Sequence, residues 1–225
     1  MEILADLHTH TTFSDGDLHP QELIRKAKQK GLKAVAITDH DNIDGLKQAH
    51  TESRKVGIDL IPGIELTCRY KNNDQGIHML GLGIDYEDPF LLKKLENIKK
   101  SREKRAVRII DMLETYEWWA DPFIFENTKG IVTTYDIARS VMNKNISTNE
   151  FYNRWLSESS PCYIDMDTLK VSDAIELIQK AGGNAICAHL QRSLHESNRI
   201  DELHTIAEDL VKKGIDGFEV FYGLN

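Results

Sequence analysis

Short apolar runs and amphipathic runs alternate along the first third of the chain. The apolar runs predict buried strands over 3–7, 34–38 and 58–61, and helical spacing predicts helices over 20–31 and 44–56. A proline opens the first helix and a glycine ends each of the two, as is common at helix ends. This order is typical of a sheet whose strands are connected by helices.

More strands and helices are expected further along the chain. A strand over 76–84 is expected to pair antiparallel with one around 65–70, through a turn at 72–74. Alternation of apolar strands with helices favours a parallel α/β sheet or a barrel. In the last third this alternation predicts helices over 172–181 and 200–213 and strands over 184–188 and 217–222.

The segment between these two parts has a different character. From Pro89 onward apolar positions recur at helical spacing beneath a heavily charged face, which predicts a long helix. Three tryptophans, Trp118, Trp119 and Trp155, are expected to anchor the packing of this segment. We therefore divide the chain into an N-terminal barrel part, an inserted helical subdomain and a C-terminal barrel part, over residues 1–88, 89–165 and 166–225.

Composition and charge narrow the classes of function. A chain of 225 residues can bury a core without needing a disulfide or a metal to fold. The formal net charge of −8 argues against a broad basic surface for long duplex nucleic acid or an anionic membrane. No transmembrane run and no secretory signal is visible, which favours a cytoplasmic protein. The cysteines Cys68, Cys162 and Cys187 are expected to be reduced thiols.

The strongest chemical signal is His8-Thr9-His10 at the end of the first strand. Side chains at i and i+2 of a strand point to the same side, so the two imidazoles project together. Such a pair is suited to a metal ion, although a histidine at one of these positions can also be a hydrogen-bonded core residue.

The surrounding sequence favours the metal interpretation. Five histidines and two carboxylates lie at or near predicted strand ends, and in a barrel these ends share the face that carries active sites. Nitrogen and carboxylate donors without an obligatory thiolate suit Zn²⁺, Mn²⁺ or Fe²⁺. The set is larger than one ion needs, so we expect two or three ions, with Glu65 able to bridge two of them. The expected ligands are His8, His10, Asp15, His40, Glu65, His78 and His189.

The order and spacing of these motifs resemble those of the polymerase and histidinol phosphatase (PHP) superfamily. The matching segments are His8-Thr9-His10, Ser14-Asp15-Gly16, residues 37–41, 62–65, 78–81 and Ala188-His189. The resemblance is greatest to the stand-alone branch with a helical insertion, which includes nucleotide bisphosphatases and small-RNA 5′ exonucleases. It implies a distorted (βα)₇ TIM-like barrel, a trinuclear metal centre and phosphoester hydrolysis by a metal-activated hydroxide, with no protein nucleophile.

Arginines are the expected contacts for substrate phosphate, because the guanidinium fork matches phosphate oxygens. Arg192 closely follows His189, at a place where the family often has a basic residue. Arg102 and Arg105 lie on the inserted helix, which covers the site in this branch; a solvated helix face is the alternative for both. Arg139 belongs to a segment that resembles the family's Arg-Pro-His-Ile-Ala-Arg.

Two departures from the family pattern affect these expectations. Thr134-Tyr135-Asp136 stands where the family usually has Arg-Pro-His, so substrate choice is open, and Asp136 becomes a candidate site residue. The family's last ligands form an Asp-x-His element after the strand at 217, and the chain ends at Asn225 without it. We therefore expect a barrel that is incomplete at its C-terminal end and, if the chain is whole, fewer ions and weak activity. A truncated chain is the explanation that we favour.

The predicted function is a cytoplasmic metal-dependent phosphoric ester hydrolase acting on a nucleotide or a short oligonucleotide. The alternatives are a histidinol-phosphate-type phosphatase and a catalytically silent metal-binding module. Asp6 and Asp41 are expected to fill capping or turn roles, with orientation of ligand histidines as the alternative. Cys187 is expected to be a buried inert thiol. The other histidines, His19, His50, His195 and His204, are expected at the surface.

Overall fold

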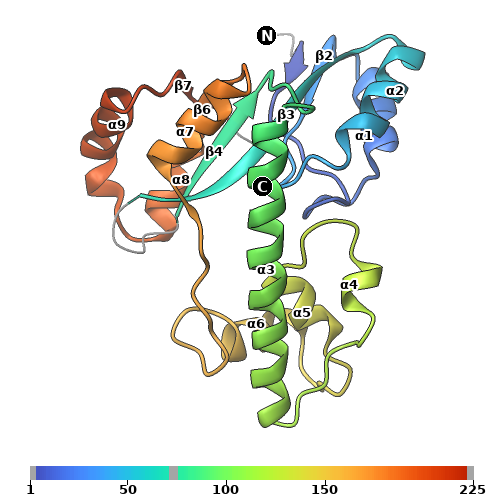
Figure 1. Cartoon of the computed structure of the whole chain (residues 1–225), viewed down its shortest axis with the longest axis vertical. Helices are drawn as coiled ribbons and strands as arrows, with labels where there is room; N and C mark the ends of the chain where they lie inside the picture. Colours follow the sequence, from blue (N-terminus) through green and yellow to red (C-terminus); the bar gives the residue numbers. More distant parts are fainter. Residues whose placement is uncertain (1–3, 71–75, 222–225) are drawn as a thin grey trace. The chain divides into compact units, whose positions relative to one another are not determined.

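The computed structural model describes residues 4–70 and 76–221 of the chain (Figure 1). The chain forms two compact units, of which the first comprises Met1–Leu95 and Thr168–Asn225 and the second comprises Glu96–Asp167. The division into domains at 1–88, 89–165 and 166–225 stays a prediction.

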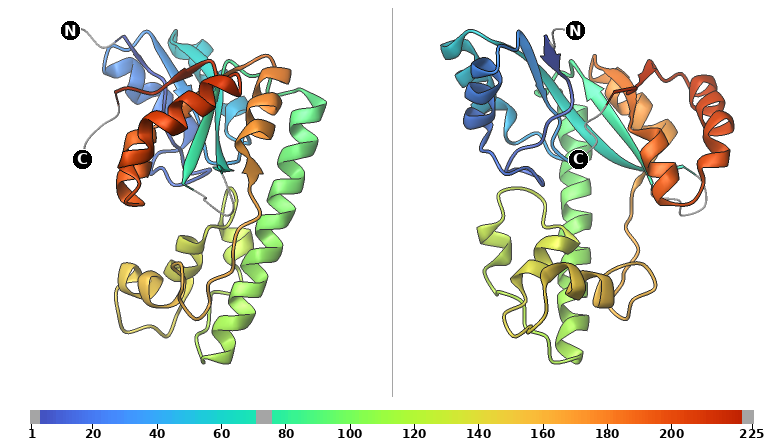
Figure 2. Two further views of the ribbon diagram at one scale, coloured as in Figure 1. Left: turned by 90° about the vertical axis from the view of Figure 1, so that its left-hand side faces the viewer. Right: turned by 180° about the vertical axis from the view of Figure 1, so that it is seen from behind.

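The first unit is built on one mixed sheet that curls into a half-barrel (Figure 2). Its strands lie in the order β1-β2-β3-β4-β6-β7, and the short strand β5 pairs with the end of β3. The predicted α/β class is thereby confirmed. The strands span Ala5–Asp6 (β1), Ala34–Ile37 (β2), Asp59–Arg69 (β3), Ile77–Leu82 (β4), Leu169–Lys170 (β5), Asn184–Ala188 (β6) and Gly217–Phe218 (β7).

Strand β4 is the antiparallel member of the sheet, as its predicted hairpin with β3 requires. This strand runs antiparallel to both β3 and β6, whereas β1, β2 and β3 are mutually parallel and β6 is parallel to β7. The reason is the short connection between β3 and β4, which can join only antiparallel neighbours. The predicted hairpin is confirmed, with Glu65 opposite Leu80; its turn at 72–74 lies outside the described residues.

Strand β3 is one continuous strand, where the sequence predicted two shorter ones over 58–61 and 65–70. Pro62 lies within this strand, and its carbonyl accepts from the backbone N–H groups of Gly83 and Ile84. Gly63 allows a close approach, since a Cβ at this position would lie 2.8 Å from Thr38 Cγ2. The Pro-Gly pair therefore continues the strand instead of ending it.

Helices cover the sheet of the first unit in two groups (Figure 1). Helices α1 (Pro20–Gln29) and α2 (Leu46–Val56) contact each other and lie beside β2 and β3. Helices α7 (Val171–Lys180) and α8 (Leu190–Glu196) contact β4, and α8 is followed by a 3₁₀ turn and α9 (Leu203–Lys212). Within the described ranges, no helix combines the length and apolarity that a membrane crossing requires.

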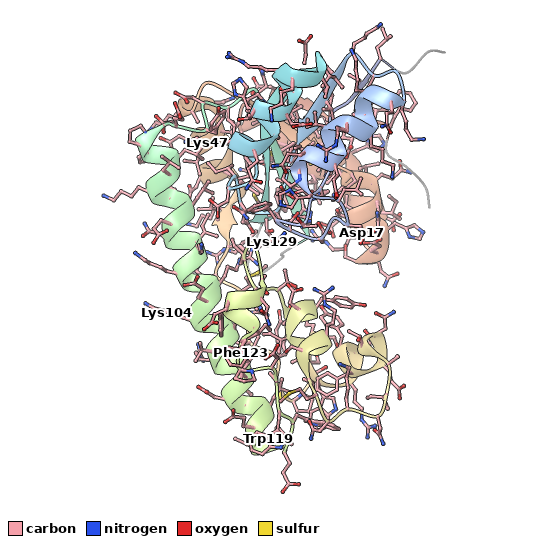
Figure 3. All side chains as sticks on the ribbon, turned by 90° about the vertical axis from the view of Figure 1, so that its right-hand side faces the viewer. Asp17, Lys47, Lys104, Trp119, Phe123 and Lys129 are labelled. Carbon is pink, nitrogen blue, oxygen red and sulfur yellow. The ribbon has the colours of Figure 1, made fainter. Side chains whose placement is uncertain are left out.

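The second unit is helical. Helix α3 (Pro89–Thr115) begins in the first unit and continues into the second, and the core of the second unit includes Ile109, Leu113 and Phe151. Two of the expected anchors pack here, since Trp118 lies edge-on to Phe151, with centroids 5.2 Å apart, and Trp155 stacks on the same ring. Trp119 is 48% exposed (Figure 3), so its predicted packing role is wrong. The other helices are α4 (Ile124–Asn127), α5 (Thr134–Ser140) and α6 (Thr148–Trp155).

Candidate metal centre

The seven predicted ligands come together in the first unit. His8 and His10 follow β1, His40 follows β2, and His189 follows β6. Glu65 and His78 lie on the neighbouring strands β3 and β4. The expected pairing of His8 with His10 holds although β1 has already ended at Asp6, because their Nε2 atoms lie 3.0 Å apart.

Glu65 is the centre of the cluster. It is completely buried in β3, and each of its two carboxylate oxygens faces its own group of histidines. Oε1 lies 2.9 Å from His78 Nδ1 and 3.1 Å from His189 Nε2. Oε2 lies 3.1 Å from the Nε2 atoms of both His8 and His10 and 3.3 Å from His40 Nδ1. Each oxygen of the Glu65 carboxylate therefore has its own set of nitrogen donors.

Asp15 forms the outer side of the cluster. Its Oδ1 lies 3.1 Å from His10 Nδ1, its Oδ2 lies 3.8 Å from His40 Nε2, and its side chain is 62% exposed. The loop that carries Asp15 turns tightly at Gly16, where a Cβ would lie 2.2 Å from the His10 carbonyl oxygen. Only glycine therefore fits at this position.

Asp39 anchors the loop that carries Asp15, a role that the sequence analysis missed. This carboxylate is 1% exposed. It accepts hydrogen bonds from the backbone N–H and hydroxyl of Thr11, both at 2.7 Å, and from the Ser14 hydroxyl at 2.6 Å. Its place at the end of β2, next to His40, is a signal that could have identified it.

We expect Asp39→Asn to lower the free energy of unfolding by roughly 2 kcal/mol, because an amide cannot accept all three hydrogen bonds and one buried donor loses its partner. Chemical denaturation of the metal-free protein measures this, with Asp59→Asn, at the exposed start of β3, as the matched control. Equal stability of the two variants would show that Asp39 does not anchor the loop.

The histidines of the cluster lower the pKa values of its two carboxylates. Burial alone would raise the pKa of Glu65, but hydrogen bonds with His10, His189, His78 and His8 outweigh it and hold the pKa far below its usual range. The hydrogen bond with His10 likewise holds the pKa of Asp15 below its usual range.

The pKa values of the histidines depend on burial and on the carboxylates that they contact. Burial disfavours the charged forms of His8 and His10, yet hydrogen bonds with carboxylates raise the pKa of His8 to about 9 and that of His10 to about 10. For His40 burial dominates and lowers the pKa. Without a cation, protons on His8 and His10 therefore balance the charge of the carboxylates.

The residues of this cluster fit divalent cations. Three overlapping groups each bring three donor atoms within 4.8 Å of one another: His8, His10 and Glu65; His10, Asp15 and His40; and His40, Glu65 and His78. His40 Nδ1 is buried and has no hydrogen-bond partner within the described part of the chain, although Glu65 Oε2 is 3.3 Å away. Convergent nitrogen and carboxylate donors of this kind are typical of catalytic Zn²⁺, Mn²⁺ and Fe²⁺ sites.

Glu219 is a further member of the cluster that the sequence analysis did not select. Its Oε1 lies 3.0 Å from His8 Nδ1, and its Oε2 accepts from the backbone N–H of His189 at 2.9 Å. Glu219 directly follows β7, just as His189 directly follows β6. The rule that strand ends carry the site could therefore have identified it.

The arginines predicted to bind phosphate already have protein partners. Arg192 lies on α8, three residues after His189, and its Nε donates to Glu196 at 2.8 Å. In the second unit, Arg105 donates to the Ile164 carbonyl at 2.7 Å and Arg102 contacts Met166. A role of these residues in substrate binding stays a prediction.

Asp136 and Arg139 lie in the second unit, on α5. The Asp136 carboxylate accepts from the backbone N–H and hydroxyl of Thr133, which forms the capping box of that helix, and from Arg139 at 2.8 Å. Asp136 thus has a local structural function, and its candidacy as a substrate-binding residue stays a prediction, as does that of Arg139.

The remaining candidates have ordinary environments. Asp41 accepts from the backbone N–H and hydroxyl of Thr67, both at 3.0 Å, which ties the end of β2 to β3. Cys187 is fully buried, and burial raises the pKa of its thiol to about 12, which agrees with an inert side chain. His50 Nδ1 makes a 2.8 Å hydrogen bond with the Tyr86 hydroxyl, away from the cluster.

With five imidazoles and two carboxylates gathered at one edge of an α/β sheet, the protein has the features of α/β proteins with a metal centre. A family model described as PHP domain matches residues 6–220. The chain therefore belongs to the PHP family, as its motifs predicted.

Curated relatives support the same class. A 5′-3′ exoribonuclease from Haemophilus influenzae is 36% identical over 190 residues, covering 82% of this chain and 68% of that protein. The 5′-3′ exoribonuclease of Escherichia coli is 31% identical over 196 residues, covering 83% and 65%. A 3′,5′-nucleoside bisphosphate phosphatase from Chromobacterium violaceum is 28% identical over 234 residues, covering 97% and 76%. The chain spans about two thirds of the length of the exoribonucleases that it matches.

Solved structures agree with the fold. A candidate metal-dependent phosphoesterase from Bifidobacterium adolescentis superposes with a TM-score of 0.82 at 25% identity, covering 96% of this chain and 77% of the other. An amidohydrolase from Chromobacterium violaceum gives 0.80 at 25% identity, covering 96% and 76%. The predicted class, a metal-dependent phosphoesterase, is confirmed as the class of these relatives, and neither the histidinol-phosphate alternative nor the silent module is favoured.

Proposed function

We propose that this chain hydrolyses a phosphate ester of a nucleotide or a short oligonucleotide with the help of divalent cations held around Glu65. The observation that carries the proposal is the division of the buried Glu65 carboxylate between two groups of histidines. Two to three ions are proposed, with Mn²⁺, Zn²⁺ or Fe²⁺ as candidates. The sheet is proposed to be part of a distorted (βα)₇ barrel, and the protein is proposed to be cytoplasmic.

The chemistry divides between the cations and the chain. Bound divalent cations neutralise the charge of a phosphate ester and lower the pKa of a water molecule. The chain supplies the donors and fixes their orientation: Ser193 makes a 3.1 Å hydrogen bond with His189 Nδ1, which directs Nε2 toward Glu65. No side chain of the cluster is required as a nucleophile, because histidines and carboxylates that bind cations are engaged through their lone pairs.

The proposed substrate follows from the relatives and from the charge of the chain. One relative is named a 5′-3′ exoribonuclease and another a 3′,5′-nucleoside bisphosphate phosphatase, so RNA and nucleoside bisphosphates are the substrate classes that we propose for this chain. With a formal net charge of −8, the attraction for an anionic substrate comes from the cations of the site instead of a basic surface. Arg192 is the proposed phosphate contact nearest in sequence to the cluster, with Arg102, Arg105 and Arg139 as further candidates.

A substrate panel tests the proposal. In the presence of Mn²⁺, the protein is expected to release phosphate or nucleotides from a 3′,5′-bisphosphorylated nucleoside or a short 5′-phosphorylated RNA, and not from histidinol phosphate. His8→Ala is expected to remove this activity, whereas His204→Ala, at an exposed position of α9, is expected to retain it. Hydrolysis of histidinol phosphate alone, or equal activity of the two variants, would contradict the proposal.

A further inference from the structure

Glu219 connects the segment after β7 with the segments after β1 and β6. In the strand order, β1 is at one end and β7 is at the other, and no ladder joins these two strands within the described residues. Glu219 follows β7, and its carboxylate contacts His8, which follows β1, and His189, which follows β6. One side chain thus links both ends of the open sheet at the edge where the cluster lies.

The contact with His8 determines which ring nitrogen faces the cluster. Glu219 Oε1 accepts a hydrogen bond from His8 Nδ1, so Nε2 is the ring nitrogen that faces Glu65 and His10. Histidines that bind metals usually donate their other ring N–H to a carboxylate, which fixes the tautomer and raises the basicity of the ligand. Glu219 belongs to none of the three donor groups found in the described part of the chain.

The contact with His189 acts on the backbone. His189 has φ 30° and ψ 42°, in the left-handed region that residues with side chains rarely adopt. The backbone N–H of this residue donates to Glu219 Oε2 at 2.9 Å, which helps to hold the strained conformation. The conformation in turn places the ring with Nε2 3.1 Å from Glu65 Oε1.

We propose that Glu219 is a positioning residue that sets the orientation of His8 and His189 for cation binding by clamping the segment after β7 to the segment after β1. The inference rests on the proposed function insofar as His8 binds a cation. The sheet cannot supply this constraint itself, because β1 and β7 are two-residue strands at opposite ends of its strand order.

A double-mutant cycle tests the proposal by Mn²⁺ titration calorimetry on the wild type, Glu219→Gln, His8→Ala and the double variant. We expect Glu219→Gln to weaken Mn²⁺ binding about 10- to 100-fold, the range for partners of metal ligands. In the His8→Ala background, its effect is expected to be at least about fivefold smaller, because residues that act through one another are not additive. Glu176→Gln, at an exposed position of α7, is the matched control and is expected to bind Mn²⁺ like the wild type.

Circular dichroism of the metal-free proteins shows whether each variant folds, and Glu219→Asp replaces Glu219→Gln if the latter does not. The aspartate keeps the charge but shortens the reach, so weakened Mn²⁺ binding is again expected. Unchanged affinity of a folded Glu219 variant would overturn the positioning role, and effects that add fully with His8→Ala would overturn its action through His8. A wild type that binds no divalent cation would instead overturn the proposed function, so the two failures are distinguishable.

Discussion

Replacing Glu65 by Gln is expected to lower phosphoesterase activity by at least about 10³-fold and to abolish tight binding of divalent cations. The expected loss exceeds the 10- to 100-fold typical of residues that only orient a metal ligand. Glu65 is the carboxylate that five imidazoles face, and an amide oxygen carries neither the charge nor the second acceptor.

The control for this variant is Glu52→Gln on α2, a carboxylate paired with Arg25 at 2.8 Å. It is expected to retain activity and cation binding, because it lies outside the cluster. Steady-state hydrolysis and metal analysis of both purified variants check the prediction. A Glu65→Gln protein that keeps a normal complement of ions would show that the carboxylate is not the centre of the site.

Apparent affinity for divalent cations is expected to rise steeply with pH between about 7 and 9. His8, with a pKa of about 9, and His10, with a pKa of about 10, are protonated at neutral pH in the metal-free protein. Ligands must be deprotonated to bind, so a cation displaces up to two protons, and affinity increases up to about 100-fold per pH unit. Calorimetry in buffers of different ionisation enthalpy counts the protons that are released.

Stability of the metal-free protein is expected to change in the opposite direction. Because the folded-state pKa values of His8 and His10 are raised above the ordinary 6.5, their contribution is present below that pH and is lost as the pH rises through 9 and 10. The lowered pKa values of Glu65 and Asp15 contribute stability above their ordinary 4.5 and 3.8, which is lost in acid. A metal-free protein that becomes more stable from pH 7 to 10, or cation affinity that is independent of pH, would contradict this account.

The site was more predictable from the sequence than the sheet. Short apolar strands followed by His identify strand ends, and the ends of parallel strands meet at one edge of an α/β sheet, which is why His8, His10, His40 and His189 lie together. Glu65 and His78 were expected at strand ends as well, but they lie within β3 and β4 and reach the cluster from there. The direction of β4 relative to β3 was predictable because a short turn connects these two strands. The further pairing of β4 with β6 joins residues more than 100 positions apart, for example His78 and Ala188, and no local pattern encodes such a pairing.

The residues that the sequence analysis missed act through contacts that are distant along the chain. Asp39 binds a loop that begins 28 residues earlier, and Glu219 reaches His8 across 211 positions. Their positions at strand ends could have marked both as candidates, but the partners of Asp39 and Glu219 become visible only when the strands are in place. Trp119 illustrates the opposite error, because a large aromatic residue beside a buried one was expected to be buried as well.

The central claim is that the cluster around Glu65 binds divalent cations that act in phosphoester hydrolysis. The most direct measurement is phosphate release from a 3′,5′-bisphosphorylated nucleoside by chelator-treated protein before and after addition of Mn²⁺, with wild type and Glu65→Gln in parallel. We predict that Mn²⁺ restores hydrolysis in the wild type and not in Glu65→Gln. Hydrolysis that proceeds equally without the cation, or that Mn²⁺ restores equally in both proteins, would contradict the claim.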